Sequence, residues 1–415
     1  AWLVQPAKLP RPLREQIEKL LEPAGIAGIV RPGEDGPDKL VHTSGRPEIE
    51  WAELPEHVTI VLRADQHADL LARVRAGTAV QLAFSIDNRF FRGPVPQHNV
   101  IADLRGSEHP DEYVIVGGHL DSWDGATGAN DNATGVATTM EAARLLVAAG
   151  ARPKRTIRFV LWGGEEQGLH GSTTYVEQHA DELPRVSAVL IHDMGTNYLS
   201  GIGITPEMRP QMEQAFAPVL QLAPQTMPFE LRDAQSLETG GSDHTPFIRA
   251  GVPGFFWDQA GESSYDYVHH TQHDTLERVI VEYQRHSAMV VALAAYGIAN
   301  LPELVDRTNS APIPRRRIGA MFDDTLEVSE LEEDGVAAKA GWKVGDRIVS
   351  IDGQAPEGAR GVLRAIRDGG PTQQVVVQRA GKPRTTTLDW SSTPGEQQRQ
   401  ERQRARDRAR APQGQ

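Results

Sequence analysis

The sequence predicts an α/β protein in which helices flank a mostly parallel central sheet, with a small α/β module before this domain and a compact β-rich unit after it. The main observation is an alternation of strand and helix patterns that begins at Asn99, in which the strands are almost continuously apolar. Such strands are typical of a parallel sheet that is covered on both faces. The length of 415 residues agrees with several domains rather than one.

Residues 1–97 carry the patterns of the small first module. In order, we expect a helix in REQIEKLLEPAG, strands in IAGIV and VTIVLRA, a helix in DQHADLLARVRAG and a strand in TAVQLAFSI. The two prolines of FFRGPVPQH then mark a domain boundary.

Residues 98–305 hold the alternating elements of the main domain. We expect, in order, the strands NVIADL and EYVIVGGHLD, a helix after Ala133, the strand TIRFVLWGGEE, a helix in STTYVEQH, the strand SAVLIHDM and a closing helix from about Leu276 to Leu301. Acidic residues follow several of these strands. The carboxyl edge of an open α/β sheet is where binding sites form, so we expect the functional site there.

The last part of the chain is predicted to fold separately. Residues 306–316 resemble a linker, and residues 317–390 contain short strands, two short helices and a hairpin in QVVVQRAGKPRTTTLDW. We expect the Gln/Arg-rich residues 391–415 to be disordered, because they show no apolar periodicity.

The composition excludes several classes of function. The formal charge is −13 and no basic stripe interleaves with aromatic residues, so we expect no nucleic-acid partner. No apolar run approaches the roughly 20 residues that span a bilayer. The chain begins at Ala1 rather than Met, and we expect that its natural N-terminus is missing, together with a signal peptide for secretion or export to a periplasm.

The strand ends and the loops beside them carry a set of imidazole and carboxylate groups that suits a metal centre. The candidate residues are His119, Asp121, Asp131, Glu165, Glu166, Asp193 and His270. The first three come from one run, HLDSWDGATGAND, between a strand and a helix. Imidazole and carboxylate are ligands that zinc accepts, and the chain has no cysteine to add a thiolate. More than four such groups together indicate two metal ions rather than one.

Glu165 and Glu166 suit two different tasks. Adjacent carboxylates after a strand point in different directions, so one can bind metal while the other accepts a proton from water. An isolated Glu-Glu pair is usually two solvated surface acids. The Trp and the paired glycines of WGGEEQG favour a site instead, because they bring backbone close to a neighbouring group.

Two assignments stay open on the residues alone. Asp131 precedes a helix, where it suits either an N-cap or a carboxylate that bridges two cations. Each of His269, His270 and His273 suits a ligand, a packed residue or a surface group.

The supporting residues are predicted from their neighbours. We expect Asp121 to accept the ring N–H of His119 and so to orient that imidazole. Asp274 and Thr275 are expected to cap the helix that follows them. We interpret His192 as a core residue rather than a ligand.

Five motifs in this order resemble the dinuclear-zinc exopeptidases, the family that includes bacterial leucyl aminopeptidase and plasma glutamate carboxypeptidase. The motifs are HLDSWDGATGANDNATGV, VLWGGEEQGLHGS, IHDMG, GGSDHTPF and HHTQHDTLE. They cover about Asn99 to Leu301, and HLDSWD looks closest to the carboxypeptidase branch.

The resemblance implies a zinc exopeptidase fold and a role for each candidate residue. It makes Asp131 the bridge between two zinc ions, His119 and Asp193 the ligands of one, and Glu166 and His270 the ligands of the other. It also implies that Glu165 is the general base, which takes a proton from water and delivers it to the leaving amine.

The chain departs from the family pattern at two places. Asn132 stands where some members have a second acid, and no tyrosine precedes SDH, where leucyl aminopeptidases supply one that stabilises the oxyanion. We expect that task to fall to the metal ions and another donor, for which His244 is a candidate. Ser242 and Asp243 are not interpreted as a serine-protease pair.

The flanking regions resemble two binding modules. Residues 1–97 are similar to the later part of a protease-associated domain, which implies that the module is truncated. Residues 317–390 resemble a PDZ domain, with RIGAMF at the position of a carboxylate-binding loop. Such a domain binds an extended chain by strand addition and captures a C-terminal carboxylate.

The sequence therefore predicts a secreted or periplasmic zinc exopeptidase that removes N-terminal residues from peptides or splits short peptides. Two other classes are compatible with this fold, a metal-free relative that serves as a receptor or binding scaffold and a single-zinc aminoacyl cyclase. The complete ligand set and the presence of Glu165 favour the peptidase.

Overall fold

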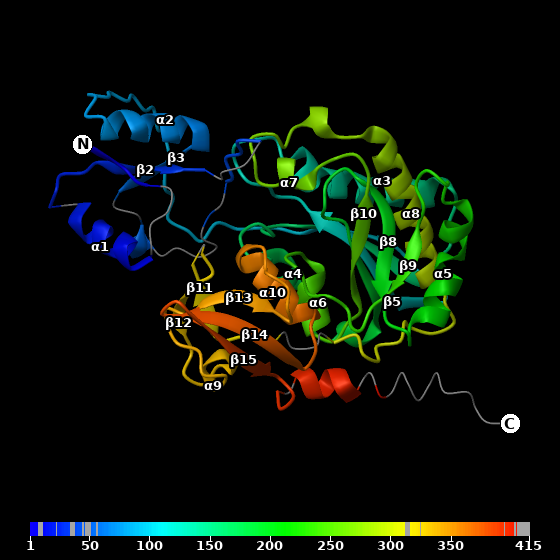
Figure 1. The fold of residues 1–415 in the computed structure, drawn as a ribbon. Coiled ribbons are helices and arrows are strands. Elements are labelled where there is room, and N and C mark those ends of the chain that lie inside the picture. The colour runs from blue at the N-terminus through cyan, green and yellow to red at the C-terminus, as the bar shows by residue number, and fades with distance from the viewer. Residues whose placement is uncertain are drawn as a thin grey trace. The chain divides into compact units, whose positions relative to one another are not determined.

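The computed structural model divides the chain into two compact units, residues 1–312 and 313–415 (Figure 1). The structure describes residues 1–6, 11–21, 23–33, 38–43, 45, 51–54, 57–311, 316–323, 325–393, 395–401 and 404. Among the described residues, no helix is long and apolar enough to cross a membrane.

The first unit opens with a small parallel sheet. Its strands are β1 (Trp2–Val4), β2 (Gly28–Pro32) and β3 (Val58–Leu62), in the order β1-β2-β3, and its helices are α1 (Arg11–Leu21) and α2 (Ala64–Arg75). A 3-10 turn, Trp51–Glu53, precedes β3. The core of this module is small, with Leu21, Ile29, Val30 and Leu70 buried.

The predicted strand TAVQLAFSI does not form. Residues 78–99 contain no regular secondary structure, and several of their apolar side chains, including Val80, Leu82 and Ile86, are exposed. The alternation of apolar and polar residues is that of a strand, but a strand also needs a neighbour to accept its backbone hydrogen bonds. No described residue pairs with this segment, although Phe84 places its ring 4.7 Å from that of Trp2.

The main sheet of the first unit has seven strands in the order β4-β6-β5-β7-β10-β8-β9. They are β4 (Val100–Leu104), β5 (His109–His119), β6 (Arg155–Trp162), β7 (Val186–Ile191), β8 (Tyr198–Ile204), β9 (Glu230–Asp233) and β10 (Gly254–Ala260). Strands β6, β5, β7 and β10 run parallel, whereas β4 is antiparallel to β6 and β8 is antiparallel to β10. This arrangement confirms the predicted α/β class with a mostly parallel sheet.

Helices cover both faces of this sheet (Figure 1). They are α3 (Thr134–Ala148), α4 (His170–Gln178), α5 (Arg209–Leu222), α6 (His244–Arg249), α7 (Tyr265–Val268) and α8 (Val281–Ala299). Val114 and Val116 of β5 pack in a cluster with residues of α3, α5 and α8, while Ile115 packs in a second cluster with residues of α4 and α6. Successive side chains of a strand point to opposite faces, so a stretch buried on both faces must be apolar throughout, as residues 113–118 of β5 are.

The three central parallel strands bring their carboxyl ends to the same edge. In the register of the sheet, His119 at the end of β5 lies opposite Trp162 at the end of β6, and Gly117 of β5 lies opposite Ile191 at the end of β7. The residues that follow these ends are therefore neighbours in space, although up to 74 positions separate them in the sequence.

The second unit is a small β-rich fold with its own core. Its elements are β11 (Ala320–Phe322), β12 (Val328–Leu331), α9 (Val336–Lys339), β13 (Arg347–Ile351), α10 (Gly358–Asp368), β14 (Thr372–Arg379) and β15 (Lys382–Asp389). Strands β13, β14 and β15 form an antiparallel sheet, and β14 and β15 form the predicted hairpin. The buried side chains of Val328, Ile348, Val362, Val375 and Trp390 belong to one apolar cluster.

The expectation of a disordered tail from residue 391 is wrong for its first part. Residues 395–401 are helical, and Glu396 is buried with its carboxylate 2.6 Å from Nη2 of Arg316. The guanidinium of Arg316 also lies over the Trp390 ring, at 5.5 Å from the centroid. A buried ion pair orders this segment without apolar periodicity, which explains why the pattern missed it. Residues 405–415 lie outside the described part of the chain.

Candidate metal centre

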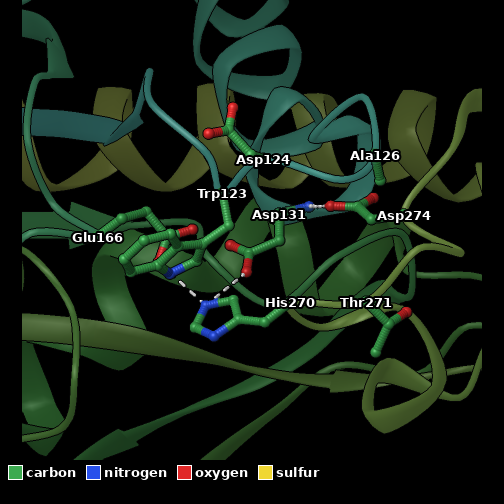
Figure 2. Close-up of a pocket in the computed structure, with 8 residues that line it drawn as sticks. All are labelled: Trp123, Asp124, Ala126, Asp131, Glu166, His270, Thr271 and Asp274. Carbon is green, nitrogen blue, oxygen red and sulfur yellow. Dashed lines mark hydrogen bonds and ion pairs between the residues drawn. The ribbon is translucent and has the colours of Figure 1, made fainter. Parts of the chain in front are cut away.

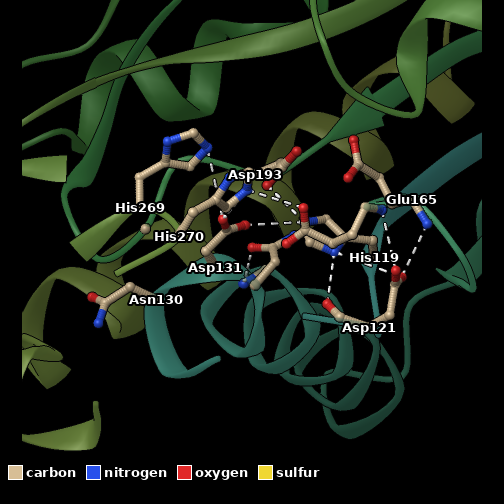
Figure 3. A network of polar contacts seen from close by, with 12 residues as sticks. His119, Asp121, Asn130, Asp131, Glu165, Asp193, His269 and His270 are labelled. Atoms are coloured by element: carbon tan, nitrogen blue, oxygen red, sulfur yellow. Dashed lines mark hydrogen bonds and ion pairs between the residues drawn. The ribbon is translucent and has the colours of Figure 1, made fainter. Parts of the chain in front are cut away.

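His119 lies at the end of β5 with only 1% of its surface exposed. Its Nδ1–H donates to the backbone carbonyl of Asp121 at 2.9 Å, which turns Nε2 toward the carboxylates of Asp193 at 2.9 Å and Asp131 at 3.2 Å (Figure 3). Burial opposes a charge on this ring, but the carboxylates of Asp193, Asp131 and Glu165 outweigh it and hold the pKa of His119 above its ordinary value.

Asp131 lies between two imidazoles. Its Oδ1 is 3.2 Å from Nε2 of His119, and its Oδ2 is 3.3 Å from Nε2 of His270. Burial favours the neutral acid, but hydrogen bonds from the two imidazoles hold the pKa of Asp131 below its usual range. The residue makes no N-cap hydrogen bond to α3, since Oδ1 of Asn132 accepts from the backbone N–H of Gly135 there. The geometry is therefore that of a bridging carboxylate rather than a cap.

Glu166 and His270 meet on the other side of Asp131. Nε2 of His270 lies 3.0 Å from Oε2 of Glu166, and the His270 ring packs edge-on against the Trp123 indole at 6.2 Å (Figure 2). Burial disfavours the charged imidazole, yet Asp131 and Glu166 raise the pKa of His270 to about 10. These residues line a pocket of about 190 Å³, which Trp123, Asp124, Ala126, Thr271 and Asp274 complete.

The structure brings a further histidine to the centre. Nε2 of His269 lies 3.9 Å from Oδ2 of Asp131, and its ring stacks on that of His270 at 3.8 Å. In the described part of the chain, two groups of three residues hold ligand atoms within 4.8 Å of one another, namely Asp131 with His269 and His270, and His119 with Asp131 and Glu166. His273 is turned elsewhere, since its ring stacks on Tyr267 and its Nε2 contacts the side-chain amide of Gln272.

Glu165 is buried close to the candidate ligands (Figure 3). Its side chain is 8% exposed, and burial, with the charges of Asp193, Asp243 and Glu166, raises its pKa to about 9. Cations bound beside it would lower that pKa, because they neutralise the surrounding carboxylates. A carboxyl group in this position is suited to exchange a proton with a molecule at the centre.

Asp121 does more than the predicted orientation of His119. Its backbone carbonyl, rather than its carboxylate, accepts the His119 ring N–H, while its carboxylate Oδ1 lies 3.8 Å from Nδ1. The carboxylate instead accepts the backbone N–H groups of Glu165 and Glu166, both at 3.1 Å. Asp121 therefore fixes the turn that carries both glutamates, as well as one imidazole.

Asp274 is a supporting residue whose predicted role was wrong. It makes no cap to the turn Leu276–Arg278, and its carboxylate accepts instead from the backbone N–H of Asn130 at 2.5 Å and of Asp131 at 3.1 Å. The sequence suggested a cap because Asp before a helix usually is one. Its role in holding the loop of Asp131 depends on contacts across 143 residues, which no local pattern contains.

Tyr265 is a site residue that the sequence did not indicate. Its ring stacks on His269 at 4.9 Å and lies against Gly195, two residues after Asp193. Burial, with the charges of Asp193, Asp131, Glu166 and Glu165, holds its pKa well above the ordinary value, so its hydroxyl is a neutral donor. Its position five residues before His270 was the only available signal.

His244 does not offer the expected donor. Its Nε2 lies 3.1 Å from the backbone carbonyl of Glu238, so its N–H is used there, and burial lowers its pKa to about 4. His192 is likewise buried, as expected of a core residue, and burial lowers its pKa to about 4. Asp243 is fully buried, and neither of its oxygens has a hydrogen-bond partner among the described residues.

The donor set fits zinc. Oε1 of Glu166 is buried with no hydrogen-bond partner in the part of the chain that the structure describes, and the buried Oδ2 of Asp131 has ion-pair contacts to the imidazoles of His270 and His269 at 3.3 and 3.9 Å. A buried carboxylate oxygen without a donor is costly unless a cation satisfies it. Imidazole nitrogen and carboxylate oxygen are ligands that zinc takes, so His119, Asp131 and Asp193 would hold one ion and Asp131, Glu166 and His270 another.

The parallel sheet with an imidazole and carboxylate cluster at its carboxyl edge defines a class of metal-centred α/β protein. Comparison with known families describes this class more closely. Residues 99–295 match peptidase family M28, and residues 327–379 match the PDZ domain family. These two matches agree with the exopeptidase and PDZ resemblances of the sequence motifs.

Curated relatives match about half of the chain. Carboxypeptidase Q of Xenopus laevis is 32% identical over 244 residues, which are 58% of this chain and 50% of that protein. Carboxypeptidase Q of Bos taurus is 36% identical over 215 residues, 51% of this chain and 43% of that protein. The chain thus spans about half the length of the curated relatives it matches.

A solved structure agrees in fold. The crystal structure of a peptidase M28 precursor from Shewanella amazonensis superposes with a TM-score of 0.53 at 27% sequence identity. The match covers 68% of this chain and 62% of that one.

Proposed function

We propose that the chain carries the catalytic domain of a zinc exopeptidase that removes residues from the N-terminus of peptides or splits short peptides. The observation that carries the proposal is Asp131, whose two oxygens face His119 on one side and His270 on the other. One carboxylate shared by two imidazole-bearing groups is the arrangement that a two-metal hydrolytic centre needs. The match to peptidase family M28 supports the same reaction class.

The residues of the site have distinct tasks in this reaction. Bound zinc would supply Lewis-acid activation of a water molecule and of the scissile carbonyl. Glu165 takes the proton of the attacking water and passes it to the leaving amine, while Asp121 holds the Glu165 backbone in place. The neutral hydroxyl of Tyr265 is a donor for the developing oxyanion, which replaces the tyrosine missing before SDH.

The flanking regions serve recognition in this proposal. Residues 1–97 are a protease-associated module, and the PDZ domain binds the C-terminal end of an extended peptide or protein by strand addition. The substrates are peptides, and the protein acts in a secreted or periplasmic location. Deleting residues after about 315 should leave the cleavage of small aminoacyl substrates unchanged, and loss of that cleavage would contradict this division.

Glu165→Gln tests the mechanism. The change keeps the shape of the side chain and removes its basicity, so we expect turnover to fall by about 100-fold to 10,000-fold while zinc content is unchanged. Zinc per chain, by elemental analysis, and turnover of aminoacyl substrates check this. Near-normal activity would remove Glu165 from the role of base, and one zinc per chain would favour a cyclase-like centre.

A peptide panel tests the direction of attack. Short peptides with free and blocked N-termini are incubated with the zinc-loaded chain and analysed by mass spectrometry. Cleavage that requires a free amine supports aminopeptidase action. Cleavage of blocked peptides from the other end would assign carboxypeptidase action and overturn the N-terminal part of the proposal.

A further inference from the structure

A segment of the N-terminal module lies against the loops of the metal centre. The backbone N–H of Thr43 donates to the carbonyl of His270 at 2.7 Å, and His42 forms an antiparallel bridge with Thr271. The backbone N–H of Val41 donates to Oε1 of Gln272 at 3.3 Å. Residues 41–43 therefore run beside 270–272 as a short strand-like contact across more than 220 positions of sequence.

The same segment also holds the loop that follows β5. Oγ1 of Thr43 donates to the backbone carbonyl of Asp124 at 2.9 Å. Gly45 lies so close to the Trp123 indole that a Cβ there would meet ring carbon Cη2 at 2.5 Å. Thr43 thus uses its backbone and its side chain to tie together the loops that carry His270 and Trp123.

His270 needs such support because its backbone is strained. Its φ is +57°, a left-handed conformation that a residue with a Cβ seldom adopts. Strained backbone persists only where the surrounding structure holds it, and here the hydrogen bond from Thr43 falls on the carbonyl of that same residue. His269 and Thr271, on either side, have ordinary negative φ, so the strain lies at the candidate ligand itself.

We propose that Thr43 is a positioning residue of the metal centre, through which the N-terminal module sets the place of His270 and of Trp123 at the pocket. The inference rests on the proposed function in taking His270 as a zinc ligand. It adds that the half of the centre formed by His270 and Glu166 depends on a segment outside the peptidase domain. The half formed by His119 and Asp193 does not.

Zinc titration of three variants of the full chain tests this. Thr43→Val removes the donor to Asp124 and keeps the backbone N–H, Thr43→Pro removes the N–H that His270 accepts, and Thr43→Ser keeps both donors. Metal-free protein is titrated with zinc against a chelator. We expect one zinc to bind as in the unmodified chain and the other to bind roughly fivefold more weakly in Thr43→Val, more weakly still in Thr43→Pro, and nearly unchanged in Thr43→Ser.

Thr59→Val is the matched control, because Thr59 is exposed on β3 of the same module, where it pairs with Ile29 of β2. Hydrogen exchange at residues 268–275 adds a readout independent of metal, and we expect faster exchange in Thr43→Val and Thr43→Pro only. Unchanged titration and exchange in both variants would overturn the inference. If the unmodified chain cleaves no peptide but the Thr43 variants still bind one zinc more weakly than it does, only the peptidase proposal is overturned. If the unmodified chain binds no zinc, both proposals are overturned.

Discussion

His119 and His270 belong to different halves of the candidate metal centre and are held in place by different means. His119 ends a central strand, is 1% exposed and has an unstrained backbone, so the sheet itself aims its ring. The side chain of His270 is 25% exposed, and the residue lies in a loop at φ +57°, where Thr43 holds its carbonyl. A ligand on regular structure needs little help, whereas a ligand on a loop needs contacts from elsewhere in the chain.

The carboxylates differ in the same way. Asp193 lies two residues after the end of β7, so its place depends closely on the sheet register. Glu166 lies in a turn after β6, where the Asp121 carboxylate accepts the backbone N–H groups of Glu165 and Glu166. The His119 half is therefore the rigid part of the centre, and the His270 half is the part that the surrounding loops adjust.

Asp131→Ala should have the largest effect, because it removes the group common to both halves. We expect activity to fall by more than about 1,000-fold and neither zinc to bind tightly. Equilibrium dialysis with zinc and turnover of an aminoacyl substrate measure the two quantities. Two tightly bound zinc ions in this variant would show that the halves are independent sites.

Replacing each imidazole separately should reveal the difference between the halves. In the metal-free chain, His119→Ala leaves the buried Asp193 carboxylate without its partner, so we expect it to lower the free energy of unfolding by roughly 3 kcal/mol. His270→Ala also leaves buried carboxylates, those of Asp131 and Glu166, without this partner, but the imidazole is 25% exposed and solvent screens part of the loss, so we expect a smaller cost of roughly 1 to 2 kcal/mol. Denaturant unfolding checks both. Equal losses would contradict the contrast between a rigid and an adjustable half.

Asp274→Ala should act on the loop of Asp131 without removing a ligand. Its carboxylate accepts two backbone N–H groups that otherwise lose their partners. We expect zinc affinity to fall about 10-fold to 100-fold. Competition with a chelator measures this, and an affinity equal to that of the unmodified chain would show that the loop holds its shape unaided.

The smallest effect concerns pH. The pKa of Glu165 is raised to about 9 and that of His270 to about 10, so these two groups hold more protons in the folded metal-free chain than in the unfolded one above about pH 6.5, where the buried His192 and His244 are neutral in both states. Its stability should therefore fall by a few degrees of Tm between pH 7 and 9. Zinc displaces these protons, so the rise in Tm on adding zinc should grow with pH. Thermal melts in buffers of different pH test this, and a pH-independent zinc effect would contradict it.

Sequence patterns predicted β4, β5, β6 and β7 of the main sheet, and the last three are largely buried and largely apolar, which is why the pattern is clear there. They did not predict β8, β9 and β10. They failed for TAVQLAFSI and for residues 395–401, where a missing partner strand and a buried ion pair decided the outcome. Both depend on what a segment meets after folding, which local periodicity does not encode.

The sequence by itself determined the fold class, the residue types at the strand ends and the family resemblance. Strand ends in a parallel sheet meet at one edge, so His119, the two glutamates and Asp193 had to be neighbours. Only the tertiary structure decided that Asp131 faces two imidazoles, that Asp274 holds its loop and that Thr43 supports His270. These are contacts between loops far apart in the chain, and loop positions follow from packing and hydrogen bonds that no short stretch of sequence contains.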